Sequence, residues 1–139
     1  MRSMLAGIAL LFALGCGMKE IKLPESGADL TGTVTYNNEK VQVAMVIVES
    51  ASSSAAGHVN DDGTFLIHNV PLGEVNIGIN TDAGKGELRG KMMARAQTKQ
   101  KIEMPKIVDV PVKYSNPATS GIKTTINKGP NKYDVVIKK

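Results

Sequence analysis

The stretch that decides the fold spans residues 58–79, HVNDDGTFLIHNVPLGEVNIGI. Residues 60–63 (NDDG) predict a tight turn, because glycine adopts positive φ without strain and Asx side chains bond nearby backbone N–H groups. Apolar and polar residues alternate on both sides of residues 70–73 (VPLG), which predicts a corner between two strands. The stretch is therefore typical of a β domain, and it indicates no reaction and no ligand.

Length and composition agree with a small β domain. The chain has 139 residues, which is typical of one domain with a modest core. Fourteen glycines, six prolines and many β-branched residues favour an all-β fold. The formal net charge of +4 is a mild excess, so we expect no nucleic-acid partner.

The N-terminus has the pattern of a short targeting segment. Arg2 precedes an apolar run at residues 4–14, and Gly15 and Cys16 follow it. This run is too short to span a bilayer as a helix, which needs about 20 residues. Residues 13–16 (ALGC) resemble the lipobox of bacterial lipoproteins, with Ala13 and Leu14 as departures. We therefore expect a lipoprotein signal peptide at residues 1–15 and a lipid on Cys16; the alternative is an ordinary secretory signal with an incidental cysteine.

The remaining chain predicts a tether and a sandwich. Residues 16–29 are polar and lack strand or helix periodicity, which predicts a tether between lipid and domain. Residues 30–139 carry about seven short apolar or alternating runs separated by turns, which predicts a β-sandwich. Besides the opening stretch, the expected strands lie at residues 30–36, 41–49, 107–112, 122–127 and 133–138.

A basic insert at residues 82–106 interrupts the β pattern. Leu88 and Met92 have helical spacing, but Gly86 and Gly90 lie in the same window and each costs a helix about 1 kcal/mol. We therefore expect an exposed loop with at most a turn or two of helix. Its basic residues form a candidate anion-binding patch for lipid or polysaccharide phosphate: Lys85, Arg89, Lys91, Arg95, Lys99 and Lys101, with Lys106 beyond them.

The alternative for this patch is a solvent-exposed loop whose charges serve only solubility. Glu87 and Glu103 interrupt the basic run, and no aromatic residues interleave with it. The sequence favours this alternative.

The first half of the chain contains four motifs of turn and core residues: Gly32-x-Val34, Ala44-x-Val46-x-Val48, residues 61–67 (DDGTFLI) and residues 70–77 (VPLGEVNI). Together they resemble the carboxypeptidase regulatory-like domain. The resemblance covers residues 30–79 and implies a prealbumin-like (transthyretin-like) sandwich of about seven strands. It implies an accessory module and carries no catalytic residue.

Candidate metal sites are weak in this sequence. Asn60, Asp61 and Asp62 lack the acidic residues that a calcium loop needs at both ends, so a turn is favoured. His58 and His68 are the only histidines. If a hairpin places Val59 opposite Thr64, the two imidazoles lie roughly 10 Å apart and share no metal. We expect no metal site and no cofactor.

The sequence favours a non-enzymatic, lipid-anchored β-sandwich module of the bacterial cell envelope, facing the periplasm or the exterior. Its role would be structural or protein-binding, with an envelope protein or glycan as partner. A carbohydrate- or peptidoglycan-binding module is the alternative, although sugar platforms usually need exposed aromatic side chains. A small hydrolase or metal enzyme that uses His58 or His68 is the third hypothesis, and no nucleophile elbow supports it.

Overall fold

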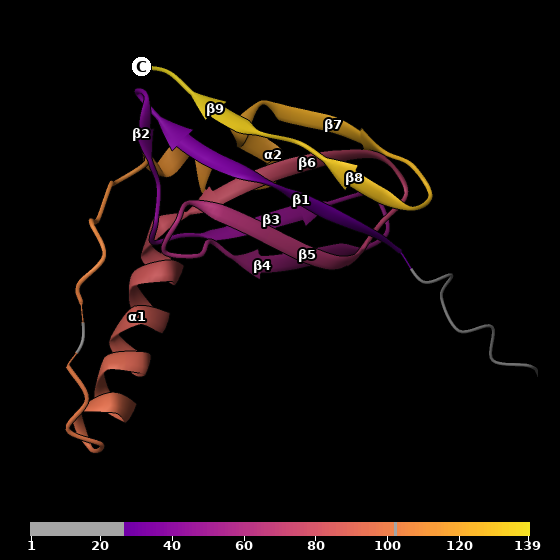
Figure 1. The fold of residues 1–139 in the computed structure, drawn as a ribbon. Coiled ribbons are helices and arrows are strands. Elements are labelled where there is room, and N and C mark those ends of the chain that lie inside the picture. The colour runs from indigo at the N-terminus through magenta and orange to yellow at the C-terminus, as the bar shows by residue number, and fades with distance from the viewer. Residues whose placement is uncertain (1–26, 102) are drawn as a thin grey trace, which may run out of the picture.

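The computed structural model describes residues 27–101 and 103–139 (Figure 1). The expected signal peptide, Cys16 and most of the tether lie outside these residues. No helix in the described part of the chain is long and apolar enough to cross a membrane.

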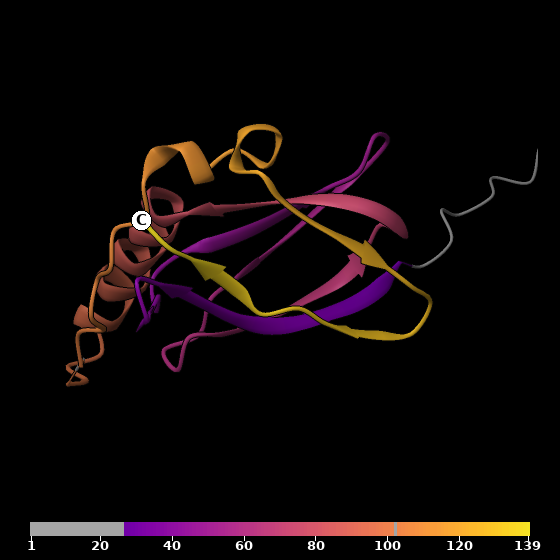
Figure 2. The ribbon, with the colours of Figure 1, turned by 90° about the horizontal axis from the view of Figure 1, so that it is seen from above.

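Two β-sheets face each other, as expected for a β-sandwich (Figures 1 and 2). In the first sheet, β1 (Ala28–Tyr36) pairs antiparallel with β2 (Glu39–Lys40) and β5 (Thr64–Val70), and parallel with β8 (Pro130–Lys132) and β9 (Val135–Ile137). The second sheet has the order β4 (Ser54–His58), β3 (Met45–Glu49), β6 (Gly73–Asn80) and β7 (Ile122–Ile126).

The described residues contain nine strands where about seven were expected. The expected last strand at 133–138 is present as the shorter β9, and β8 precedes it at residues 130–132, outside the expected strands. The two pair with different parts of β1. The expected strand at residues 107–112 is wrong, since this segment pairs with no strand. Val108 and Val110 are nevertheless buried, so the segment contributes to the core without joining a sheet.

The core lies between the sheets and follows the alternation in the sequence. Leu30 and Val34 point inward from β1, and Val75 and Ile77 do so from β6. Phe65, which is 2% exposed, is the largest fully buried side chain. Burying each such side chain contributes about 1.5–3 kcal/mol, so this inward set stabilises the sandwich.

The opening stretch forms the expected turn but not the expected hairpin. Gly63 has a φ of 82°, and its N–H donates to the carbonyl of Asn60 at 2.9 Å. The chain then passes from one sheet to the other, because β4 pairs with β3 and β5 pairs with β1. An isolated bridge between β4 and β5 places Val59 opposite Phe65 instead of Thr64.

The expected loop at residues 82–106 is wrong over most of its length, because α1 (Thr81–Ala96) is a helix of 16 residues. The side chain of Asn80 caps it by accepting a hydrogen bond from the N–H of Ala83 at 2.9 Å. Two short helices, η1 (Val112–Tyr114) and α2 (Pro117–Ser120), then pack beside β6, and the hydroxyl of Ser120 donates to the carbonyl of Ile77.

Candidate functional site

Residues 82–106, most of α1 and the segment that returns from it, form an arm that projects from the sandwich (Figures 1 and 2). The arm leaves the end of the sandwich opposite to the one where the described chain enters β1. Its return segment is attached near the sandwich by Lys106, whose N–H donates to Gln42 Oε1 at 3.0 Å. The ammonium of Lys106 lies 3.1 Å from a carboxylate oxygen of Glu39. The base of the arm is therefore fixed to the sandwich while its tip extends into solvent.

Gly84 sets how closely α1 approaches the sandwich. A Cβ atom at this position would lie 2.5 Å from the backbone nitrogen of Ala44 and 2.6 Å from its Cα. Real Cβ atoms do not approach backbone atoms so closely, so any side chain here would force the helix away. Glycine lowers helix propensity, yet at position 84 it allows the helix to pack closely on the sandwich.

A groove with a cavity volume of about 130 Å³ lies where the arm meets the sandwich. Leu88 and Met92, which the sequence places at helical spacing, both line it from α1. Apolar side chains and charged or ionisable side chains contribute to the lining of the groove in similar numbers. The apolar residues are Val43, Ala44, Val59, Leu88, Met92 and Pro105, and the charged or ionisable residues are His58, Asp61, Glu87, Lys91, Arg95 and Glu103.

A charge network crosses the groove from the sandwich to the helix. His58 Nδ1, at the end of β4, contacts Glu87 Oε2 on α1. The other oxygen of Glu87, Oε1, lies 2.7 Å from the ammonium of Lys91 one turn later. The network joins a strand to a helix far from it in sequence, and it presents both signs of charge beside an apolar floor. Such a lining suits a ligand or peptide with mixed polar and apolar groups.

The two histidines lie on different sheets and have different partners. His58 belongs to β4, whereas His68 belongs to β5 and its Nδ1 lies 2.8 Å from Asp29 Oδ1. In residues 27–101 and 103–139, no group of three or more His, Cys, Asp or Glu side chains is placed to hold a metal ion.

The acidic residues of the 60–63 turn have structural partners. Asp62 Oδ1 accepts hydrogen bonds from the hydroxyl of Thr64 at 2.6 Å and from its N–H at 2.9 Å. These bonds favour the carboxylate and lower the pKa of Asp62, the hydroxyl contributing most. The carbonyl of Asp61 accepts a hydrogen bond from the side-chain amide of Gln42. This pairing stabilises the turn against the loop that precedes β3.

The candidate anion-binding residues divide into two groups. Lys85 pairs with Asp109 and lies 3.4 Å from Asp82, and the pKa of Lys85 is raised, mainly by the hydrogen bond to Asp109. Lys91 pairs with Glu87. Within the described residues, no carboxylate oxygen lies within 4.0 Å of the cationic nitrogens of the other four: Arg89, Arg95, Lys99 and Lys101.

Sequence reasoning did not bring His58, Glu87 and Gln42 together. In the sequence Glu87 only interrupts the basic run, and its spacing of 29 residues from His58 carries no pairing signal. The i, i+4 spacing of Glu87 and Lys91 was the one available signal, and it is informative only where the segment is helical.

Comparisons with protein families, with curated proteins and with solved structures find no match for this chain.

Proposed function

We propose that this protein is a non-enzymatic, lipid-anchored β-sandwich module of the bacterial cell envelope that binds a protein partner in the groove beside α1. The lipid would be attached to Cys16, and residues 16–29 would act as the tether. The sandwich would be of the prealbumin-like type, as the resemblance of residues 30–79 implies. The two facing sheets support a sandwich of this general kind.

The observation that carries the proposal is the position of the groove relative to the tether. The described chain enters β1 at one end of the sandwich, and α1 leaves from the other (Figure 1). Strand β1 has nine residues and is therefore about 30 Å long. A domain tethered through its N-terminus would present the groove on the side away from the anchor, where an envelope protein can reach it.

The composition of the groove favours a protein over a sugar as the ligand. Sugar-binding surfaces use exposed aromatic rings, whereas Phe65 is buried and Tyr36, Tyr114 and Tyr133 are partly buried against the core. None of these four residues lines the groove. Paired charges beside an apolar floor are typical of peptide and protein recognition.

The anchor and the binding role need separate experiments. For the anchor, cells would be grown with labelled fatty acid, and we expect wild-type protein to carry the label and Cys16→Ala to lose it. A Cys16→Ala protein that is labelled as strongly as wild type would eliminate the lipoprotein half of the proposal.

For the groove, a photo-crosslinking residue would replace Lys91 in intact cells, with Lys123 on β7 as the matched control position. We expect one dominant crosslinked protein at position 91 and none at position 123. The crosslink should disappear when Leu88→Asp places a charge on the apolar floor. A crosslink that forms equally from both positions would contradict binding in the groove.

A further inference from the structure

The net charge of the protein is concentrated in the arm. Residues 82–106 hold seven basic and three acidic residues, a net charge of +4 that equals the net charge of the whole chain. The remaining residues are therefore neutral on balance. Since the arm projects from the sandwich, this charge lies on a protrusion and does not spread over the molecule (Figure 1).

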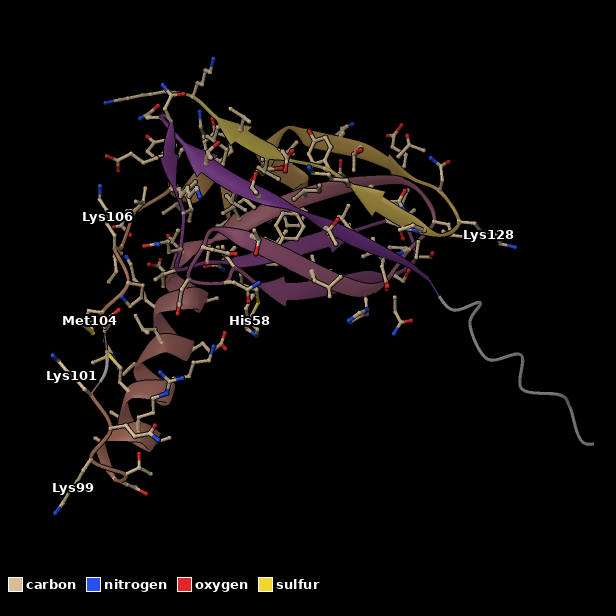
Figure 3. The ribbon with its side chains drawn as sticks, in the orientation of Figure 1. His58, Lys99, Lys101, Met104, Lys106 and Lys128 are labelled. Carbon is tan, nitrogen blue, oxygen red and sulfur yellow. The ribbon has the colours of Figure 1, made fainter. Side chains whose placement is uncertain are left out.

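The outer edge of the arm carries cations that point into solvent. Lys99 lies at the tip and points away from the sandwich, and Lys101, Met104 and Lys106 follow along the return segment (Figure 3). His58 lies on the other side of α1, beside the groove (Figure 3). Of the three lysines, only Lys106 has a carboxylate partner among the described residues.

Two methionines add exposed apolar groups to the same protrusion. Met93 is 65% exposed and Met104 is 59% exposed, and both rank among the exposed large apolar residues of the described chain. Arg89 lies one helical turn before Met93, so the two share a face of α1. We call the following set the arm surface: Arg89, Met93, Lys99, Lys101 and Met104.

We propose that the arm surface binds the surface of an anionic lipid bilayer. Lysine and arginine side chains place their charges among anionic headgroups while their apolar stems lie deeper, and flexible methionines enter the boundary between headgroups and acyl chains. None of the five residues lines the groove. The proposal therefore goes beyond the protein-binding role of the groove and does not depend on it. Because the arm leaves the end of the sandwich away from the tether, the bilayer that it meets is not the one that would hold the anchor.

The shape of this surface favours a bilayer over a folded protein partner. The five residues are spread along a protruding helix and its return segment, and none of them lines the groove. A soft, planar array of negative charges with an apolar interior can meet both the cations and the methionines. A soluble polyanion would satisfy the charges and leave the methionines in water.

The test compares full-length variants on two kinds of vesicle. One kind is pure phosphatidylcholine, and the other contains equal parts of phosphatidylcholine and phosphatidylglycerol. The N-terminal apolar segment is common to all variants, so differences among them report the arm. Lys99→Gln with Lys101→Gln should weaken binding to the anionic vesicles by about twenty-five-fold, from about fivefold for each charge. Binding to phosphatidylcholine should not change.

A matched pair of charges controls for net charge alone. Lys128 and Lys132 are exposed, and Lys128 lies at the end of the sandwich away from the arm (Figure 3). Lys128→Gln with Lys132→Gln should leave binding within about twofold of wild type, and circular dichroism should show the same helix content in every variant. If this pair weakens binding as much as the arm pair does, the proposal is overturned.

Replacing the methionines distinguishes binding to a bilayer from binding to other anions. Met93→Ser with Met104→Ser should weaken binding to anionic vesicles while leaving binding to soluble inorganic polyphosphate unchanged. If the methionine variant binds anionic vesicles as tightly as wild type, the surface recognises anions in general and assignment to a bilayer is wrong. Unchanged vesicle binding after the two lysine replacements would overturn the proposal as a whole.

Discussion

Replacing Gly84 with alanine should weaken the attachment of α1 to the sandwich, whereas the same replacement at Gly86 or Gly90 should stabilise the helix. All three glycines lie within α1, so the intrinsic gain in helix propensity is the same, up to about 1 kcal/mol each. They differ in surroundings. A Cβ atom at Gly86 or Gly90 would have no neighbour within 4 Å, and at Gly84 it would meet the backbone of Ala44.

The expected sign at Gly84 follows from two opposing terms. Helix propensity favours alanine by about 1 kcal/mol. The new methyl group would lie 2.5 Å from a backbone nitrogen that no rotamer change can move, and overpacking of this kind costs about 1–3 kcal/mol. With the cost near its upper end, Gly84→Ala should destabilise the protein by about 2 kcal/mol. The difference between this variant and Gly86→Ala should then be about 3 kcal/mol.

The three alanine variants would be compared by urea denaturation, followed by far-ultraviolet circular dichroism because the chain has no tryptophan. Hydrogen exchange of the α1 amides would show whether the loss is confined to the helix. We expect faster exchange in α1 for Gly84→Ala and slower exchange for the other two. If Gly84→Ala stabilises the protein as much as Gly86→Ala does, then α1 does not pack on Ala44 as described, and the groove is not a fixed feature.

Three further predictions concern the sandwich. Phe65→Ala should lower the free energy of unfolding by about 3–5 kcal/mol, because the ring is 2% exposed in the core; a loss below about 1 kcal/mol in urea denaturation would contradict this core position. Asp62→Asn should destabilise the protein at neutral pH, because Thr64 lowers the pKa of Asp62 and so favours the charged form in the folded state. That difference should persist above the unfolded pKa and disappear as pH falls through the folded pKa; pH-independent destabilisation would show that charge is not the cause. Gly32→Ala should yield little folded protein, since its Cβ would overlap the carbonyl oxygen of Tyr133. A soluble variant with the wild-type circular dichroism spectrum would refute this close approach of Gly32 to the backbone of Tyr133.

The architecture of the core was predictable because a strand has a period of two. Val75, Ile77 and Ile79 alternate with polar or small residues, and all three are buried in β6 as expected. The turn at Gly63 was predictable for a local reason as well, since positive φ strongly favours glycine. Both signals are carried by a few adjacent residues, so they can be recognised without knowing how the rest of the chain folds.

The helix was missed because local propensity and tertiary packing conflict there. Gly84, Gly86 and Gly90 all disfavour a helix, and the sequence cannot show that one of them permits close contact with Ala44. The cap from Asn80 and the contacts of α1 with the sandwich supply stabilisation that propensity does not include. Packing of this kind commonly outweighs an unfavourable propensity.

The sequence alone determined that this chain forms a β-sandwich with a basic segment inserted between strands, because alternation and charge are properties of neighbouring residues. Only the tertiary structure decided that the segment is a projecting helix and that His58 contacts Glu87. It also decided that Lys91 is paired, while Lys99 at the tip and Lys101 on the return segment are exposed. These contacts join residues whose separation along the chain follows no local period. They arise from the way the two sheets and α1 pack, so the groove and the arm surface appear only when the chain is folded.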